Sequence, residues 1–296
     1  MYPVSPARYF PVRDAPLTME ARLQRLGTDF GNGARDQQAF QLDREALRYR
    51  RAKGNVSMQR YGILDEGQAE RKALEKILEW MGDKLKDEHP GAQPPKTSGE
   101  NLFAAYANLA NFLQEDFAIV QQRPGDAGDR TIAVFVAFPS SWRPEAILGE
   151  SFLQIHAPVP GFADLPLQAD SMVASMVERG PYVRFVWTLT ADDALDHHPE
   201  EGERRSWRAA RSGWLRVERQ VTVPFSSEAS ALFLIRTYLY PFASLQETER
   251  GILRRSLERM PREVANYKGL DDSARTVAQR LLAEASPEGN YFTPTT

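Results

Sequence analysis

The chain has 296 residues, 42% of them hydrophobic, so it can bury a substantial core as one large domain or two modest ones. A formal net charge of −3, with no strongly basic half, argues against nucleic acid or an anionic lipid surface as a partner. The absence of cysteine excludes disulfides, a thiolate nucleophile, cysteine-ligated zinc and a cysteine-held iron–sulfur cluster within the chain.

The N-terminal third is predicted to hold an extended arm followed by helices. Residues 1–35 carry several prolines and one short amphipathic piece at 19–26. They show no basic segment followed by an apolar run, and no stretch of 18 apolar residues occurs in the chain, so we expect a cytoplasmic protein without membrane contact. Apolar residues at helical spacing predict helices over 67–86 and 102–120, with Glu115 and Asp116 on the exposed face of the second.

Strand patterns dominate the middle of the chain. Four segments rich in β-branched and aromatic residues predict strands at 131–138, 182–190, 214–223 and 231–240. No clear helical crossover separates them, which favours an antiparallel sheet.

Helical patterns return after Pro241. Ser244 and Glu247 form a candidate capping box that opens a helix ending at Pro261, and a last helix is predicted over 272–285. The order of elements predicts an α+β fold with an N-terminal part (1–99), a sheet core (100–242) and C-terminal helices (243–296), packed as one compact unit.

Strand alternation places two arginines on otherwise apolar faces. Arg219 shares its face with Leu215, Val217 and Val221, and Arg236 shares its face with Leu232, Leu234, Tyr238 and Tyr240. A buried arginine needs an anion. Each is therefore predicted to pair with an internal carboxylate (Glu115, Asp116 or Glu218), to lie at an edge where its guanidinium reaches water, or to bind the carboxylate or phosphate of a ligand.

His156 is the best candidate metal ligand among the four histidines. It follows an aliphatic run and precedes Pro158 and Pro160, which stiffen the backbone. A structural role is the alternative, since spacing alone does not indicate a metal. The adjacent His197 and His198 lie in an acidic stretch without periodicity and are predicted to be solvated.

Several segments between residues 100 and 242 occur in the order seen in a known family. They are Leu113-Gln114-Glu115-Asp116-Phe117, Phe138-Pro139-Ser140-Ser141-Trp142, Ile155-His156-Ala157-Pro158-Val159-Pro160-Gly161, Leu215-Arg216-Val217-Glu218-Arg219-Gln220 and Ile235-Arg236-Thr237-Tyr238. With these segments the chain resembles the haem-dependent oxidative N-demethylase family. After Gln220 the chain departs from the family pattern at residues 221–225, and this departure leaves the identity of the amine open.

The resemblance implies a PAS-like antiparallel sheet, with flanking N- and C-terminal helices, that holds haem b. It implies His156 as the axial ligand of the iron, Arg219 and Arg236 as partners of the haem propionates, and Tyr238 and Trp142 as catalytic residues at the pocket. In such enzymes O2 and electrons from NADPH, delivered by a separate flavin and iron–sulfur reductase, remove a methyl group from a small amine as formaldehyde. The absence of cysteine suits a chain that carries only the haem.

Two other functions are compatible with the same segments. A PAS-like fold is also used by haem or gas sensors, although no output module is recognisable in this chain. A haem-free interaction subunit is the other alternative, in which the two strand arginines would pair internally.

Overall fold

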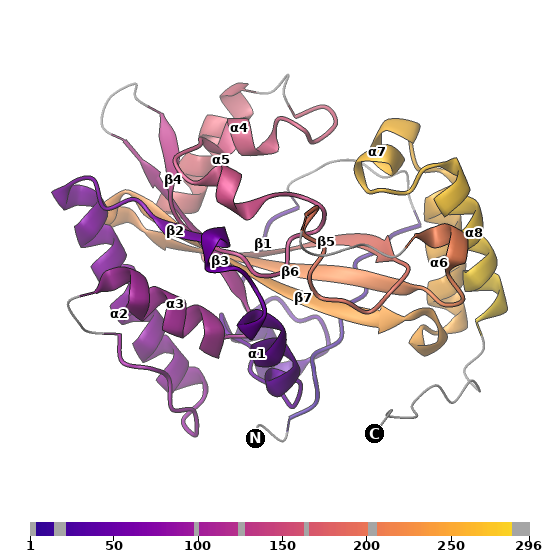
Figure 1. Cartoon of the computed structure of the whole chain (residues 1–296), viewed down its shortest axis with the longest axis horizontal. Coiled ribbons are helices and arrows are strands. Elements are labelled where there is room, and N and C mark those ends of the chain that lie inside the picture. The colour runs from indigo at the N-terminus through magenta and orange to yellow at the C-terminus, as the bar shows by residue number, and fades with distance from the viewer. Residues whose placement is uncertain are drawn as a thin grey trace.

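The computed structural model describes residues 4–14, 22–97, 101–123, 128–162, 166–200 and 206–285. In this part of the chain the strands form one antiparallel sheet of seven strands in the order β1-β5-β6-β7-β3-β4-β2 (Figure 1). The strands are β1 (Gln24–Arg25), β2 (Tyr61–Ile63), β3 (Asp116–Gln122), β4 (Asp129–Phe135), β5 (Tyr182–Thr190), β6 (Trp214–Phe225) and β7 (Ser230–Pro241).

Helices cover both sides of this sheet. They are α1 (Ala46–Gly54), α2 (Gln68–Glu88), α3 (Leu102–Phe112), α4 (Phe152–His156), α5 (Pro166–Glu178), α6 (Glu247–Glu258), α7 (Arg262–Tyr267) and α8 (Asp272–Glu284). Helices α1, α2 and α3 lie on one side of the sheet, and α4 and α5 lie on the other (Figure 1). The α+β class predicted from the order of elements is confirmed.

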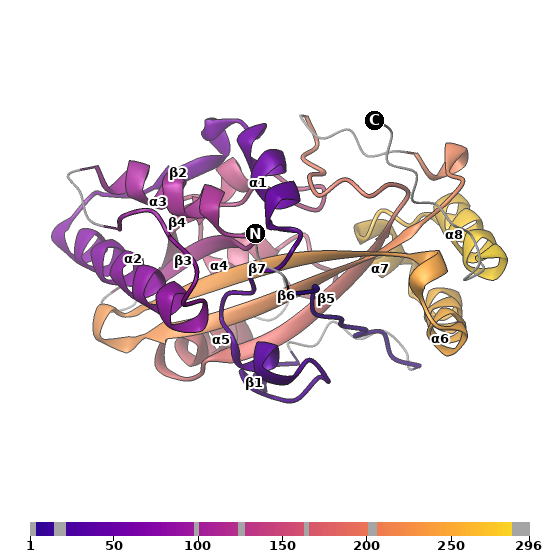
Figure 2. The ribbon, with the colours of Figure 1, turned by 90° about the horizontal axis from the view of Figure 1, so that it is seen from below.

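The strand register gives each sheet face a distinct set of side chains. Val217 and Val221 of β6 pair with Tyr238 and Leu234 of β7, and paired residues point the same way. Leu234 and Val221 pack in one apolar cluster with residues of α2 and α3, so we call this side the α3 face. Farther along the same strands, this side packs against α6 and α8, which stand at the opposite end of the sheet from α2 (Figure 2).

The second side, which we call the α5 face, carries the alternate residues of the same strands. Val120 and Ala231 are paired across β3 and β7, and both pack against α4 and α5 through Phe152 and Val173. Strands need this second layer because a sheet with two apolar faces must bury both.

The four predicted strands and their antiparallel pairing are confirmed. The sheet also recruits β1 and β2 from the N-terminal third, pairing them with β5 and β4. Part of the predicted piece at 19–26 falls outside the described residues. A PAS-like identity of the sheet stays a prediction.

The helix predicted over 102–120 is wrong in its second half. It ends at Phe112, and β3 begins at Asp116, because the alanine- and leucine-rich pattern gives way to Phe117, Ala118, Ile119 and Val120. Glu115 and Asp116 are consequently buried rather than exposed, each only 1% accessible. Asp116 is paired there with the Lys53 ammonium of α1, at 3.0 Å.

The start of α6 also differs from the prediction. The capping box is formed by Gln246 and Glu249, while Ser244 lies in a short 3-10 turn two residues earlier. The last helix and the helix over 67–86 are confirmed within three residues of their predicted ends. Within the described ranges, none of the helices combines the length and the apolar character that crossing a bilayer requires.

Candidate ligand site around His156

Helix α4 is a short helix that presents His156 at its last turn. Ser151 caps its first turn in a capping box with Gln154, which allows a helix of only five residues to start cleanly. Pro158 then follows, a residue that disfavours continuation of a helix. The His156 ring lies 4.1 Å from the ring of Phe152 and 5.1 Å from that of Phe162, measured between centroids.

A hydrogen bond defines which nitrogen of His156 carries the proton. Its Nδ1 lies 2.8 Å from the carbonyl oxygen of Phe152, and because a carbonyl can only accept, Nδ1 must donate. The Nε2 lone pair is therefore the one available to a metal. This pattern, with one ring nitrogen fixed by a carbonyl, is the usual outer contact of metal-binding histidines.

The surroundings of His156 also keep the imidazole neutral. Burial, with a smaller contribution from the positive charge of Arg184, lowers the pKa of His156 to about 4, against the opposing effect of the Phe152 carbonyl. A neutral imidazole is the form that binds iron. The ring is thus ready for a metal throughout the neutral pH range.

The low pKa of His156 predicts a pH-dependent loss of stability. Below about pH 6.5 the unfolded chain protonates this histidine and the folded protein does not, so unfolding is favoured as the pH falls from about 6.5 towards about 4. We expect urea midpoints of the wild-type protein to fall over this window more steeply than those of a His156→Asn variant. Parallel pH profiles for the two proteins would contradict the prediction.

A row of polar side chains crosses the α5 face near His156. Arg184 of β5 is paired in register with Gln220 of β6, and its Nε donates to Gln220 Oε1 at 2.7 Å. Gln220 Nε2 in turn donates to Glu218 Oε2 at 3.1 Å. The amide therefore orients the Arg184 side chain by bridging it to a carboxylate.

The apolar residues around this row are only partly covered. Val186, Phe233, Ile235 and Leu239 lie on the same face and are half-buried, whereas most apolar residues on the α3 face are buried. This face thus offers a partly accessible apolar surface beside a neutral histidine and an arginine.

Arg219 and Arg236 do not lie in this site. Arg219 pairs with Phe185 and with Arg236 across the strands, so both arginines point to the α3 face. Arg219 Nη2 donates to the carbonyl of Gln38 at 2.6 Å, and both side chains are about 1% accessible. The sheet itself therefore separates the two arginines from His156.

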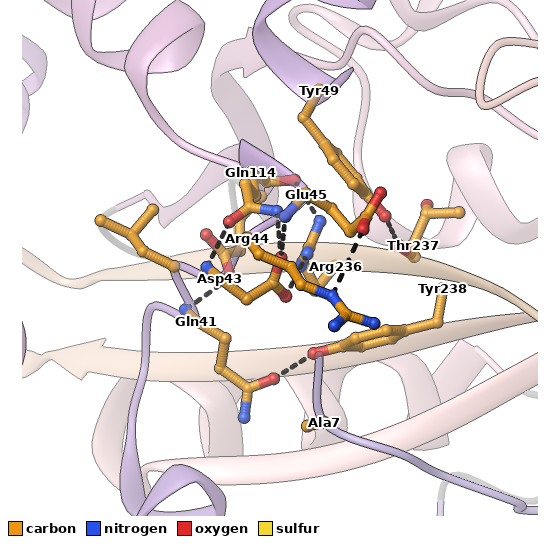
Figure 3. Close-up of polar contacts among 12 residues, drawn as sticks. Ala7, Gln41, Asp43, Arg44, Glu45, Tyr49, Gln114, Arg236, Thr237 and Tyr238 are labelled. Carbon is orange, nitrogen blue, oxygen red and sulfur yellow. Dashed lines mark hydrogen bonds and ion pairs between the residues drawn. The ribbon is translucent and has the colours of Figure 1, made fainter. Parts of the chain in front are cut away.

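Arg236 has an internal carboxylate partner, as one of the predicted alternatives requires, but the partner is Asp43 and not Glu115, Asp116 or Glu218. Its Nη2 donates to Asp43 Oδ2 at 2.9 Å, and its guanidinium lies 3.9 Å from the ring centroid of Tyr49 (Figure 3). Asp43 also accepts from Gln114 Nε2 at 3.0 Å and from the backbone N–H of Glu45 at 2.9 Å. These contacts join the N-terminal segment to the centre of the sheet.

The other two predicted pocket residues, Tyr238 and Trp142, show no contact with His156. Tyr238 lies on the α3 face, where its hydroxyl donates to Gln41 Oε1 (Figure 3). Trp142 is half-buried in the segment between β4 and a 3-10 turn at Pro144–Ile147. Of the five predicted site residues, His156 lies on the α5 side of the sheet, and Arg219, Arg236 and Tyr238 lie on the α3 face.

His197 and His198 are buried, so the prediction of a solvated loop is wrong. His197 Nε2 lies 2.8 Å from Asp192 Oδ1, and His198 Nε2 lies 3.1 Å from Glu145 Oε1. The backbone N–H of Ser141 donates to the carbonyl of His197. Asp192, part of the acidic stretch that suggested solvent, and Glu145, 53 residues from His198, are the partners that make burial of these rings possible.

Arg184 was missed by the sequence reasoning. The signal was present, since alternation along β5 places Arg184 with Val186 and Thr188 on one face, opposite Val183 and Phe185. Alternation alone could not mark Arg184 as a site residue, because it does not show that α4 covers that face of the sheet. Within the described residues, no group of three or more histidine, aspartate or glutamate side chains forms a site that could hold a metal ion by itself.

The fold and site define an α+β protein in which helix α4, packed on an antiparallel sheet, holds a neutral histidine suited to binding a metal through Nε2. Residues 40–278 match the family model described as haem-dependent oxidative N-demethylase, alpha subunit-like. The match covers more than half of the chain, and the chain belongs to this family.

Proposed function

We propose that this chain is the haem-carrying subunit of an oxidative N-demethylase, with His156 as the protein ligand of the iron. The observation that carries the proposal is the hydrogen bond from His156 Nδ1 to the Phe152 carbonyl, which leaves Nε2 available on a neutral ring. Membership of the family supplies the haem dependence and the class of reaction. A single histidine would suffice to hold the iron, because the porphyrin itself supplies nitrogen ligands to it.

The residues around His156 fit such a group. The Phe152 carbonyl fixes the ring orientation and makes Nε2 a stronger donor to a metal. The rings of Phe152 and Phe162 pack on the imidazole and limit the access of water to it. Beyond them, the half-buried apolar side chains of the α5 face, Val186, Phe233 and Ile235, suit a flat apolar macrocycle.

When bound, haem iron would supply the activation of O2 that the oxidation of an N-methyl group requires. The contribution of the chain would be to hold the iron through His156, to orient the bound group and to limit water at the site. Because the chain has no cysteine, an iron–sulfur centre that delivers electrons would lie in a separate reductase protein. We propose that NADPH is the source of those electrons, that the haem is haem b, and that the protein works in the cytoplasm.

The test is formaldehyde release from methylated amines. Protein expressed with added haem would be incubated with O2, NADPH and a flavin and iron–sulfur reductase, and with dimethylamine or trimethylamine. We expect formaldehyde and the amine lacking one methyl group in equal amounts. Omitting the reductase is the matched control and should stop the release.

Two results would replace the proposed function. Haem binding without turnover on any methylated amine would favour a haem or gas sensor. Failure of the wild-type protein to bind haem would favour a haem-free interaction subunit.

A further inference from the structure

Arg184 differs from Arg216 and Arg236, two other arginines of the sheet, in having no carboxylate within ion-pair distance in the described part of the chain. Arg236 is paired with Asp43, while Arg216 donates to the carbonyls of Leu195 and Phe138 at 2.7 and 2.6 Å. Arg184 uses Nε for Gln220 Oε1, and within the described residues no carboxylate oxygen lies within ion-pair distance of its guanidinium. Its terminal nitrogens remain available on a half-buried side chain.

Glu218, the carboxylate whose charge acts on Arg184, already has other partners. Glu218 accepts from Gln220 through Oε2 and lies 3.4 Å from Arg216 Nε through Oε1. Lys268, at the end of α7, also interacts with the Glu218 charge while its Nζ donates to the carbonyl of Trp187 at 2.6 Å. Three cations thus surround one carboxylate, and the balance of charge on this part of the α5 face is positive.

Burial makes this imbalance costly. Burial lowers the pKa of Arg184 and lowers that of Lys268 to about 8, with Glu218 opposing both effects. A half-buried guanidinium that keeps unused donors is stabilised by a ligand anion, and a carboxylate matches its two parallel donors. Arg184 lies on the α5 face, against which α4 packs through Phe152, so an anion bound by its guanidinium would be part of a ligand that also reaches His156.

We propose that Arg184, held in position by Gln220, binds a carboxylate of the ligand at His156. The inference rests on the proposed function and deepens it. The carboxylate has two possible sources: a propionate of the haem, or the carboxylate of the substrate, which would then be an N-methylated amino acid.

The test compares wild-type protein with Arg184→Gln and Arg184→Lys by titration followed through the Soret absorbance. Haem and its dimethyl ester, which lacks free carboxylates, are titrated into each apoprotein. Arg179→Gln, an exposed arginine at the end of the strand-flanking helix α5, is the matched control. Circular dichroism checks that each variant is folded. If Arg184→Gln does not fold, Arg184→Lys serves in its place, because it keeps the positive charge but lacks the two parallel donors of the guanidinium.

If the carboxylate is a propionate, Arg184→Gln weakens haem binding by about tenfold or more, as loss of a charged hydrogen bond implies, and leaves the dimethyl ester unaffected. If it belongs to the substrate, haem binding is unchanged, and the variant instead loses about tenfold in affinity for N-methylglycine but not for dimethylamine, read from the Soret shift of the haem protein. Either result supports the inference.

Two results contradict it in distinguishable ways. Equal behaviour of Arg184→Gln and wild type towards haem, its ester and both amines would overturn the inference and leave the proposed function standing. Failure of the wild-type protein to bind haem would overturn the proposed function and this inference together.

Discussion

A His156→Ala variant is expected to bind haem at least about a hundredfold more weakly than the wild-type protein, because the loss of even an outer contact of a metal ligand costs about 10–100-fold. The alanine removes the Nε2 lone pair and leaves the Phe152 carbonyl without its donor. The measurement is a Soret titration of the apoprotein with haem. Imidazole added in solution should restore part of the spectrum, since it can occupy the space left by the ring.

His89→Ala is the matched control for this experiment. His89 is also half-buried and bonded to a carbonyl, with Nε2 2.9 Å from the oxygen of Phe40, but it caps the end of α2. We expect its haem titration to match that of wild type. Unchanged haem binding by His156→Ala would exclude His156 as the iron ligand and move the site elsewhere.

An Asp43→Ala variant is expected to lose about 3–5 kcal/mol of unfolding free energy, because it leaves the buried guanidinium of Arg236 without its anion. The same change removes the acceptor for Gln114 Nε2 and for the Glu45 N–H. Urea unfolding is the measurement, and we expect a lower midpoint with an unchanged slope.

Two further variants test whether the loss comes from leaving the Arg236 charge unpaired. Asp14→Ala removes an ion pair with Arg255 that is more than two-fifths exposed on both sides, so its cost should stay below about 1 kcal/mol. Adding Arg236→Met to Asp43→Ala removes the unpaired charge and should recover a large part of the loss. If Asp43→Ala unfolds like wild type, the buried pair does not hold the N-terminal segment on the sheet.

The outcome for Arg219 and Arg236 separates two kinds of sequence signal. Alternation along β6 and β7 correctly placed both arginines among buried apolar residues, because side-chain direction in a strand follows from backbone geometry alone. It could not show which helices cover that face. Asp43, the actual partner of Arg236, lies 193 residues away in the sequence, and nothing local marks the two as neighbours.

The segment around Glu115 and Asp116 shows why one boundary was missed. A helical apolar pattern in residues 102–113 continues into a run that also suits a strand, so periodicity alone did not locate the change. The burial of Asp116 depends on Lys53, and that of Glu115 on the backbone N–H of Gln41. Both partners belong to the N-terminal segment, which reaches this part of the sheet only in the folded protein.

The sequence by itself determined the α+β class, four strands of the antiparallel sheet and the two helices α2 and α8. These follow from periodicity, capping and proline, which act over a few residues. The tertiary structure alone decided that His156 and Arg184 lie on the α5 side of the sheet while Arg219 and Arg236 lie on the α3 face, and that His197 and His198 are buried. Those results depend on which elements cover each face of the sheet, and that is set by packing between segments far apart in the chain.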